Sequence, residues 1–167
     1  AFDVATGDFT GQTFDFNAQV KALLALPDGR LLVGGDFTRV NGEAHSGTVV
    51  INPSTGQIDP SWDLQITNAL RGGAVSVRAL AYYDGNVYMG GAFTHLSGGG
   101  SSRVYARNAG RVSLSGRPDR SWNPEISGAV QAVGVSEANS AFYAGGHFTT
   151  AHGNQRAWYA AKFSTQP

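Results

Sequence analysis

The sequence predicts an all-β repeat protein built from three similar units. Three times along the chain, an apolar run ends in a glycine pair that is followed by a variable residue, a phenylalanine and a threonine. The pairs are Gly34-Gly35, Gly90-Gly91 and Gly145-Gly146, at intervals of 56 and 55 residues. A fixed period of this length is typical of units that stack on their neighbours, because no unit can bury its own apolar face.

Each unit is expected to open with an antiparallel hairpin. A second recurring apolar segment precedes each glycine pair, at residues 20–23, 77–80 and 130–133. Asp28-Gly29 and Asp84-Gly85 separate the two segments in the first two units, and tight hairpin turns need such residues because they require positive φ. A glycine pair inside the second strand predicts a bulge, or the close approach of another backbone or ring.

Further short strands complete each unit. Turn clusters follow each glycine pair, a third strand is expected near residues 47–51, and the first two units close with Asp59-Pro60-Ser61-Trp62 and Asp119-Arg120-Ser121-Trp122. Turn signals every 8 to 12 residues favour four short strands per unit. No stretch has the period of an amphipathic helix. We therefore expect one repeat domain over residues 1–167, with three units of about 55 residues.

The phase of the chain ends suggests a repeat that is cut at both ends. Residues 1–7 resemble residues 50–56, and Thr13-Phe14-Asp15 takes the place of the Ser-Trp element that the third unit lacks. The chain starts at Ala1-Phe2-Asp3, without an initiator methionine or the basic and apolar stretches of a signal peptide. We expect a processed or trimmed chain.

Composition excludes several classes of function. Charged residues make up 14% of the chain, below the ~25% of a typical soluble domain, and the formal net charge is zero. No overall field would attract nucleic acid or an anionic membrane. The absence of cysteine rules out disulfides and thiolate metal sites. No apolar run approaches the ~20 residues that span a bilayer.

One stretch resembles a known family. Residues 26–42, LPDGRLLVGGDFTRVNG, followed by Asp59-Pro60-Ser61-Trp62, resemble the bacterial delta-sixty β-propeller repeat. The double glycine after four apolar residues is also similar to the kelch repeat, although the spacing to the tryptophan differs. The resemblance implies four-stranded propeller blades and an extracellular or cell-surface location. It brings no catalytic residues to transfer.

The number of units leaves the closure of the fold open. Propellers close with 4 to 8 blades, so three blades alone would leave a gap. Two copies could form a six-bladed ring through an isologous interface. Alternatively, the chain is part of a longer array with neighbouring repeats on either side. A β-trefoil, which also has three four-stranded units, is the third possibility.

Two sets of recurring side chains are candidate binding residues. Trp62, Trp122 and the equivalent Phe14 could stack on sugar rings, but we favour packing between blades, where a large aromatic area is buried. Lys21, Arg78 and Gln131 share one position on the innermost strands. They would give a central channel a cationic character suited to an anionic ligand, or merely face water in that channel.

The residue after each glycine pair varies between Asp36, Ala92 and His147. Variation within a fixed frame is where a binding site would be grafted, although solvated turn residues give the same pattern. The four histidines lack zinc-protease spacing, and Gly98-Gly99-Gly100 lacks the lysine and helix of a phosphate loop. Asp59 and Asp119 are expected to cap turns. We assign no catalytic residue, metal or cofactor.

The sequence favours a non-enzymatic extracellular β-propeller module that acts as a recognition or assembly scaffold. Its expected partners are further copies or neighbouring repeats, and possible glycans, with no nucleic acid and no membrane insertion. One alternative is a carbohydrate-binding lectin that uses Trp62 and Trp122. A second is a hydrolase or lyase with a channel active site near Lys21, Arg78 and His147. No motif identifies a ligand or substrate.

Overall fold

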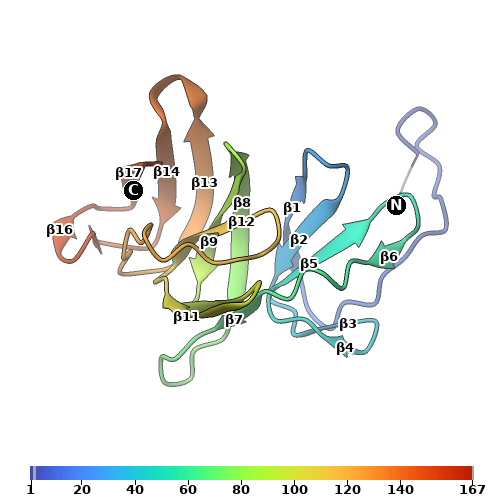
Figure 1. Cartoon of the computed structure of the whole chain (residues 1–167), viewed down its shortest axis with the longest axis horizontal. Coiled ribbons are helices and arrows are strands. Elements are labelled where there is room, and N and C mark those ends of the chain that lie inside the picture. The colour runs from blue at the N-terminus through green and yellow to red at the C-terminus, as the bar shows by residue number, and fades with distance from the viewer. Residues whose placement is uncertain (2, 167) are drawn as a thin grey trace.

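The fold is all-β and is built from short strands, as predicted. The computed structural model describes residues 1 and 3–166, and its one helical element among them is the 3-10 turn η1 (Glu137–Asn139). Within these residues, no helix has the length and apolarity needed to cross a membrane. Three main sheets follow one another along the long axis of the molecule (Figure 1). We name the chain segments built around them unit 1, unit 2 and unit 3.

Each main sheet begins with the predicted hairpin, and all strand pairs are antiparallel. The sheet of unit 1 has the strand order β1-β2-β5-β6, with β1 (Val20–Ala25), β2 (Leu31–Gly35), β5 (Thr48–Asn52) and β6 (Gln57–Ile58). The sheet of unit 2 contains β8 (Ser76–Tyr83), β9 (Asn86–Ala92) and β12 (Ala109–Ser113). The sheet of unit 3 contains β13 (Val130–Ser136), β14 (Ala141–Gly146) and β17 (Ala160–Ser164).

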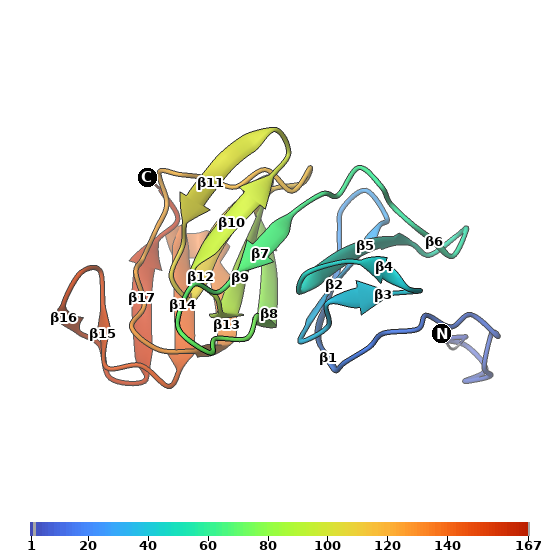
Figure 2. The same cartoon turned by 90° about the horizontal axis from the view of Figure 1, so that it is seen from below.

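A small side sheet accompanies each main sheet (Figure 2). It is formed by a hairpin between the second and third strands of the unit: β3 (Arg39–Val40) with β4 (Glu43–Ala44), β10 (His95–Gly98) with β11 (Ser101–Tyr105), and β15 (Thr150–Ala151) with β16 (Gln155–Arg156). The segment that enters the unit pairs with this hairpin. In unit 2 this segment is β7 (Gln65–Thr67), and in unit 1 it makes a single bridge between Phe16 and Val40.

The prediction of four strands in every unit holds only for unit 1. In unit 2 the fourth segment is reduced to one bridge, between Val112 and Pro118. Proline has no N–H to donate to a ladder, which prevents this segment from extending into a strand. In unit 3 only residues 165 and 166 follow β17 among the described residues. None of the sheets closes on itself there, unlike the barrel that a β-trefoil requires.

The glycine pairs are explained by two close approaches. The second glycine of each pair lies beside a bulge in the first strand, where a Cβ would collide with a backbone oxygen. The oxygens belong to Gln19, Ser76 and Ala129. The first glycine faces the neighbouring unit instead: a Cβ at Gly34 would lie 2.8 Å from Cγ1 of Val77, and one at Gly90 would lie 2.5 Å from Cγ1 of Val130.

A repeated backbone hydrogen bond fixes the corner after each pair. The N–H groups of Gly35, Gly91 and Gly146 donate to the carbonyl oxygens of Gly47, Asn108 and Tyr159 at 3.0, 3.0 and 2.9 Å. These three acceptor residues all have positive φ, at 77°, 61° and 66°. They therefore occupy one equivalent position in the three units, and only Gly47 meets its backbone requirement without a side-chain cost.

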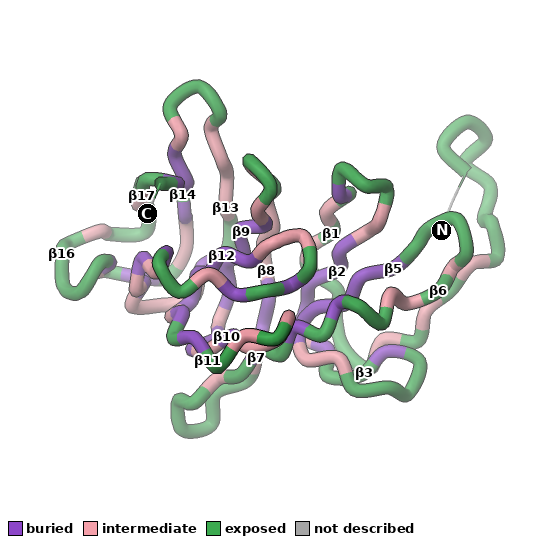
Figure 3. Tube along the Cα trace, in the orientation of Figure 1, coloured by how far each residue is buried: buried purple, intermediate pink, exposed green. Residues whose placement is uncertain are grey.

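The main apolar cores lie between units rather than inside them. One core contains Leu32 and Val50 of unit 1 together with Val77, Val87 and Met89 of unit 2. A second core contains Tyr88 and Ala109 of unit 2 with Val130, Phe142 and Ala144 of unit 3. In Figure 3 the buried segments are concentrated in β2, β5, β9 and β12. Burial between sheets makes each unit dependent on its neighbour.

Replacing the first glycine of a pair tests this dependence. Gly90→Val should lower the free energy of unfolding by about 2–3 kcal/mol, because its side chain collides with Val130 and Val133 of unit 3. Gly145→Val is the matched control: the nearest atom to a Cβ there is the Tyr159 carbonyl oxygen at 3.8 Å. Urea denaturation of both variants at a protein concentration at which the wild type is monomeric measures this difference, and equal losses of stability would contradict this account.

Candidate functional site

A cluster of charged side chains lies at one end of the inner strands β1 and β8. Nζ of Lys21 forms an ion pair with Oδ2 of Asp36 at 2.7 Å. Nε of Arg78 donates to the Ser76 hydroxyl at 3.0 Å. Two predicted site residues from unit 1 and one from unit 2 are thus brought together by the packing of β1 and β2 against β8.

The electrostatics of this cluster centre on Asp36. Burial raises the pKa of its carboxyl group, but hydrogen bonds from Lys21 and Ser76 and the charges of Lys21 and Arg78 outweigh burial and lower the pKa below its ordinary value. Asp36 is therefore ionised at neutral pH. One carboxylate beside two cations leaves a net positive charge, which is suited to an anion rather than to acid–base chemistry.

The remaining predicted site residues, which belong to unit 3, lie apart from this cluster. Gln131 and His147 occupy the equivalent positions of unit 3 and are exposed. Within the described residues, their side chains form no hydrogen bond or ion pair with the cluster around Asp36. No group of three or more histidine or acidic side chains able to hold a metal occurs in that part of the chain.

The two tryptophans lie between units. Trp62 and Trp122 are only 4% and 5% exposed, so neither presents an open indole face to a sugar. Trp122 makes edge-to-face contacts with Tyr88 of unit 2 and Phe142 of unit 3, with ring centroids 5.1 and 5.0 Å apart. Nε1 of Trp62 donates to the Thr48 hydroxyl at 3.2 Å. Both indole rings are therefore buried in contacts between units.

The equivalence of Phe14 with the tryptophans needs correction. A Cβ on Gly116 would lie 3.3 Å from the Trp62 ring, and a Cβ on the equivalent Gly56 would lie 2.5 Å from Nε2 of Gln12. Gln12 therefore holds the position of Trp62 in unit 1. Phe14 lies two residues further on and packs, half-buried, on the apolar cluster of β2 and β5. The sequence match was misaligned because both segments contain an aromatic residue beside an aspartate.

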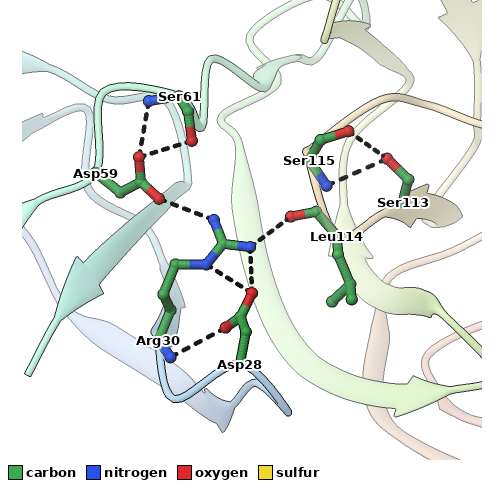
Figure 4. Close-up of polar contacts among 7 residues, drawn as sticks. All are labelled: Asp28, Arg30, Asp59, Ser61, Ser113, Leu114 and Ser115. Atoms are coloured by element: carbon green, nitrogen blue, oxygen red, sulfur yellow. Dashed lines mark hydrogen bonds and ion pairs between the residues drawn. The ribbon is translucent and has the colours of Figure 1, made fainter.

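Asp59 caps a turn, as predicted, and also forms an ion pair with Arg30, the residue that connects unit 1 to unit 2 (Figure 4). Its Oδ1 accepts hydrogen bonds from the backbone N–H and the hydroxyl of Ser61, at 2.9 and 2.7 Å. Its Oδ2 pairs with Arg30 at 2.8 Å. The same guanidinium donates to the carbonyl of Leu114 in unit 2 at 2.9 Å. The hydrogen bonds from Ser61, together with Arg30, lower the pKa of Asp59.

Arg111 and Asp119 make the equivalent connection between unit 2 and unit 3. Oδ1 of Asp119 caps the turn at Ser121, and its Oδ2 is held by Arg111 in a short ion pair. Arg111 also donates to the carbonyl of Thr165 in unit 3 at 2.5 Å. Sequence reasoning missed both arginines. Arg111 occupies the position of Val50 in unit 1, and a charged residue in place of that valine was the available signal.

An open groove of about 690 Å³ runs along the edge of unit 2. The side chains that line it are mainly polar: Arg117, Arg120, Ser101, Ser102 and Ser113. Arg120 donates to the Ser102 hydroxyl at 2.5 Å. The guanidinium of Arg117 has no partner within the described residues. In the equivalent groove of unit 1, Arg30 is neutralised by Asp28 and Asp59, so the groove of unit 1 lacks this uncompensated positive charge.

Comparison with known proteins gives one match. A family model described as a domain of unknown function (DUF5122) beta-propeller matches residues 26–61, from the end of β1 to the turn at Asp59. No curated protein matches the chain, and no solved structure matches it. The matched segment supports a β-propeller repeat at the position where the sequence resemblance was strongest.

The pH dependence of stability tests the bridge at Asp59. Because the folded-state pKa lies below the unfolded value, the ionised group stabilises the fold above about pH 4, and this contribution is lost as the pH falls through the folded-state pKa. At pH 7, Asp59→Asn should lower the free energy of unfolding by about 1–2 kcal/mol. The difference from wild type should shrink as the pH falls below about 4. Urea denaturation from pH 2 to 7 measures it, and a constant difference would refute this role.

Proposed function

We propose that this chain is a non-enzymatic β-propeller module whose three main sheets are blades, and that it acts as an assembly or recognition scaffold. The inner strand β8 lies between β1 and β13 and contacts both, which is how successive blades line a propeller axis. The family match to residues 26–61 supports the same architecture. An extracellular or cell-surface location is part of this proposal and rests on the sequence resemblance alone.

One observation supports the assembly function. The same kind of contact joins unit 1 to unit 2 and unit 2 to unit 3, and the two surfaces that form it are left uncovered on the outer side of unit 1 and of unit 3. Val77, the second residue of β8, and Val130, the first residue of β13, are completely buried against the preceding unit. The equivalent Val20 of β1 is 39% exposed, and Leu23 on the same strand is 64% exposed. Exposed apolar surface of this kind is typical of protein–protein contact sites.

The opposite end of the row is also uncovered. Tyr88 of unit 2 is 1% exposed beneath unit 3, whereas the equivalent Tyr143 of unit 3 is 40% exposed. A main sheet with one apolar face in water is stabilised by a neighbour that covers that face. We infer that the module works by associating with further units of its own kind.

The two alternative functions find less support. A lectin based on Trp62 and Trp122 would need exposed rings, and both are buried. A channel active site at Lys21, Arg78 and His147 would need these groups to meet. In the part of the chain that the structure describes, His147 forms no hydrogen bond or ion pair with the other two.

A second candidate function is recognition of an anionic ligand in the groove of unit 2. The two guanidinium groups of Arg117 and Arg120 lie there with three serine hydroxyls, and the one lining carboxylate, Asp119, is already paired with Arg111. Guanidinium groups bind the oxygens of sulfate, phosphate and carboxylate with geometric specificity. An open, polar groove of this size is suited to an acidic saccharide better than to an apolar ligand.

The assembly function is tested by measuring particle mass. Sedimentation velocity of the chain from 1 to 100 μM should show a concentration-dependent species heavier than the 17.5 kDa monomer. The association should survive high salt, because apolar burial rather than charge drives it. A well-folded monomer over the whole range would overturn the assembly function.

The groove is tested by titration with sulfate and with a sulfated disaccharide. Arg117→Ala/Arg120→Ala should weaken binding of the disaccharide at least tenfold in calorimetry. Arg71→Ala/Arg156→Ala removes the same charge from exposed positions elsewhere and should leave the affinity unchanged. Equal loss in the two double variants, or no binding to wild type, would reject the groove as an anion site.

A further inference from the structure

We propose that two copies of this chain dock head to tail, with Val20 and Leu23 of one copy packing on Gly145 of the other. The inference deepens the assembly function proposed above and rests on it. It names the partner, a second copy, and the two surfaces that meet. We call the surface of Val20 and Leu23 the head face, and the surface of Gly145 and Tyr143 the tail face.

The template for this contact is present twice within one chain. In the first instance, Gly34 of unit 1 faces Val77 and Leu80 of unit 2, and a Cβ at this glycine would lie 2.8 and 3.3 Å from their nearest side-chain atoms. In the second, Gly90 of unit 2 faces Val130 and Val133 of unit 3, at 2.5 and 2.8 Å. Both instances place two aliphatic side chains, three residues apart on an inner strand, over a glycine.

The head face has the aliphatic half of this contact. Val20 and Leu23 have the spacing of Val77 with Leu80 and of Val130 with Val133. They also have the same register against their own glycine pair, because Val20 pairs with Gly35 as Val130 pairs with Gly146. The half-buried Phe14 and Phe16 extend this face, as the buried Leu64 and Ile66 extend the corresponding face of unit 2.

The tail face has the glycine half. Gly145 has the same register in its hairpin as Gly34 and Gly90 have in theirs, yet the nearest atom to a Cβ at Gly145 is a backbone oxygen 3.8 Å away. The recess that Val77 and Val130 fill elsewhere is therefore open. Around it, Tyr143, Ala160 and Lys162 are exposed, although their equivalents in unit 2, Tyr88, Ala109 and Arg111, are all buried.

Two aromatic side chains mark the tail face as a contact surface. Trp158 and Tyr159 are 66% and 62% exposed. The residues equivalent to Trp158 in the other units bond to the next unit: the Ser46 hydroxyl donates to the Ile66 carbonyl at 2.6 Å, and Arg107 donates to the Ser127 carbonyl at 3.1 Å. Tryptophan and tyrosine are enriched among residues that contribute most to protein–protein binding.

Head-to-tail docking is favoured over docking of like faces. Two head faces would set Leu23 against Leu23 with no glycine recess to receive it, and two tail faces would bring two Lys162 cations together. One head-to-tail contact leaves a head and a tail free, so a second identical contact can form between the same two copies. The twofold pair then closes a ring of six units, within the range of closed propellers.

The test blocks one face at a time. Leu23→Glu blocks the head face, Gly145→Val blocks the tail face, and Leu70→Glu is the matched control because Leu70 is exposed in the loop before β8. Circular dichroism confirms that each variant folds. In sedimentation equilibrium, each blocked variant alone should be monomeric at concentrations where wild type and Leu70→Glu are dimeric. An equimolar mixture of the two blocked variants should form a heterodimer, because one head and one tail remain intact.

Disulfide trapping provides a second measurement on the same contact, since the chain has no cysteine of its own. Leu23→Cys mixed with Gly145→Cys should form a mixed disulfide at least tenfold faster than Leu70→Cys mixed with Gly145→Cys. If wild type associates but neither the mixed heterodimer nor the mixed disulfide forms, the head-to-tail arrangement is wrong and the assembly function stands. If wild type is monomeric throughout, both are wrong.

Discussion

The architecture depends on two glycines, which have no side chain at the contacts between units. At Gly34 and Gly90 the absence of a Cβ leaves room for a valine from the next unit, so that two sheets approach closely enough to share one apolar core. A sheet of three or four short strands buries little surface alone. Because the recess and the valine that fills it belong to different units, stability is a property of the row rather than of any single sheet.

Polar contacts also connect neighbouring units, and those made by Arg30 and Arg111 run in the same direction along the chain. The aspartate that closes each of the first two units uses one carboxylate oxygen to cap its own turn and the other to hold an arginine. That arginine then reaches a carbonyl of the next unit. Since a carbonyl oxygen only accepts and a guanidinium only donates, the bond has a fixed sense along the row. Valine–glycine packing lets the sheets approach closely, and the arginines connect each unit to the next.

The sequence was sufficient to predict the class of fold, the three hairpins and the turn-capping role of the aspartates, because each depends on residues close together in the chain. Asp84 and Gly85 both have positive φ, as a tight hairpin requires. The fourth strand of unit 2 failed because Pro118 stops the ladder. The cluster at Asp36 was predicted only in part, since Ser76 shows no pattern that would associate it with Asp36. Arg30 and Arg111 could not be matched in one role from the sequence, because Arg30 lies before β2 and Arg111 lies within β12, and only the folded arrangement brings each to a backbone carbonyl of the next unit.

The two arginines lie at different places in their units. Arg30 lies immediately before β2, whereas Arg111 lies in the middle of β12. Each arginine nevertheless belongs to the same unit as the aspartate that it holds, Arg30 with Asp59 and Arg111 with Asp119. An exchange of whole units would therefore carry each connection along intact. A recombination point between Arg30 and Asp59 would instead combine Asp59 with Asn86, the residue that unit 2 has in place of Arg30, and the link to the next unit would be lost.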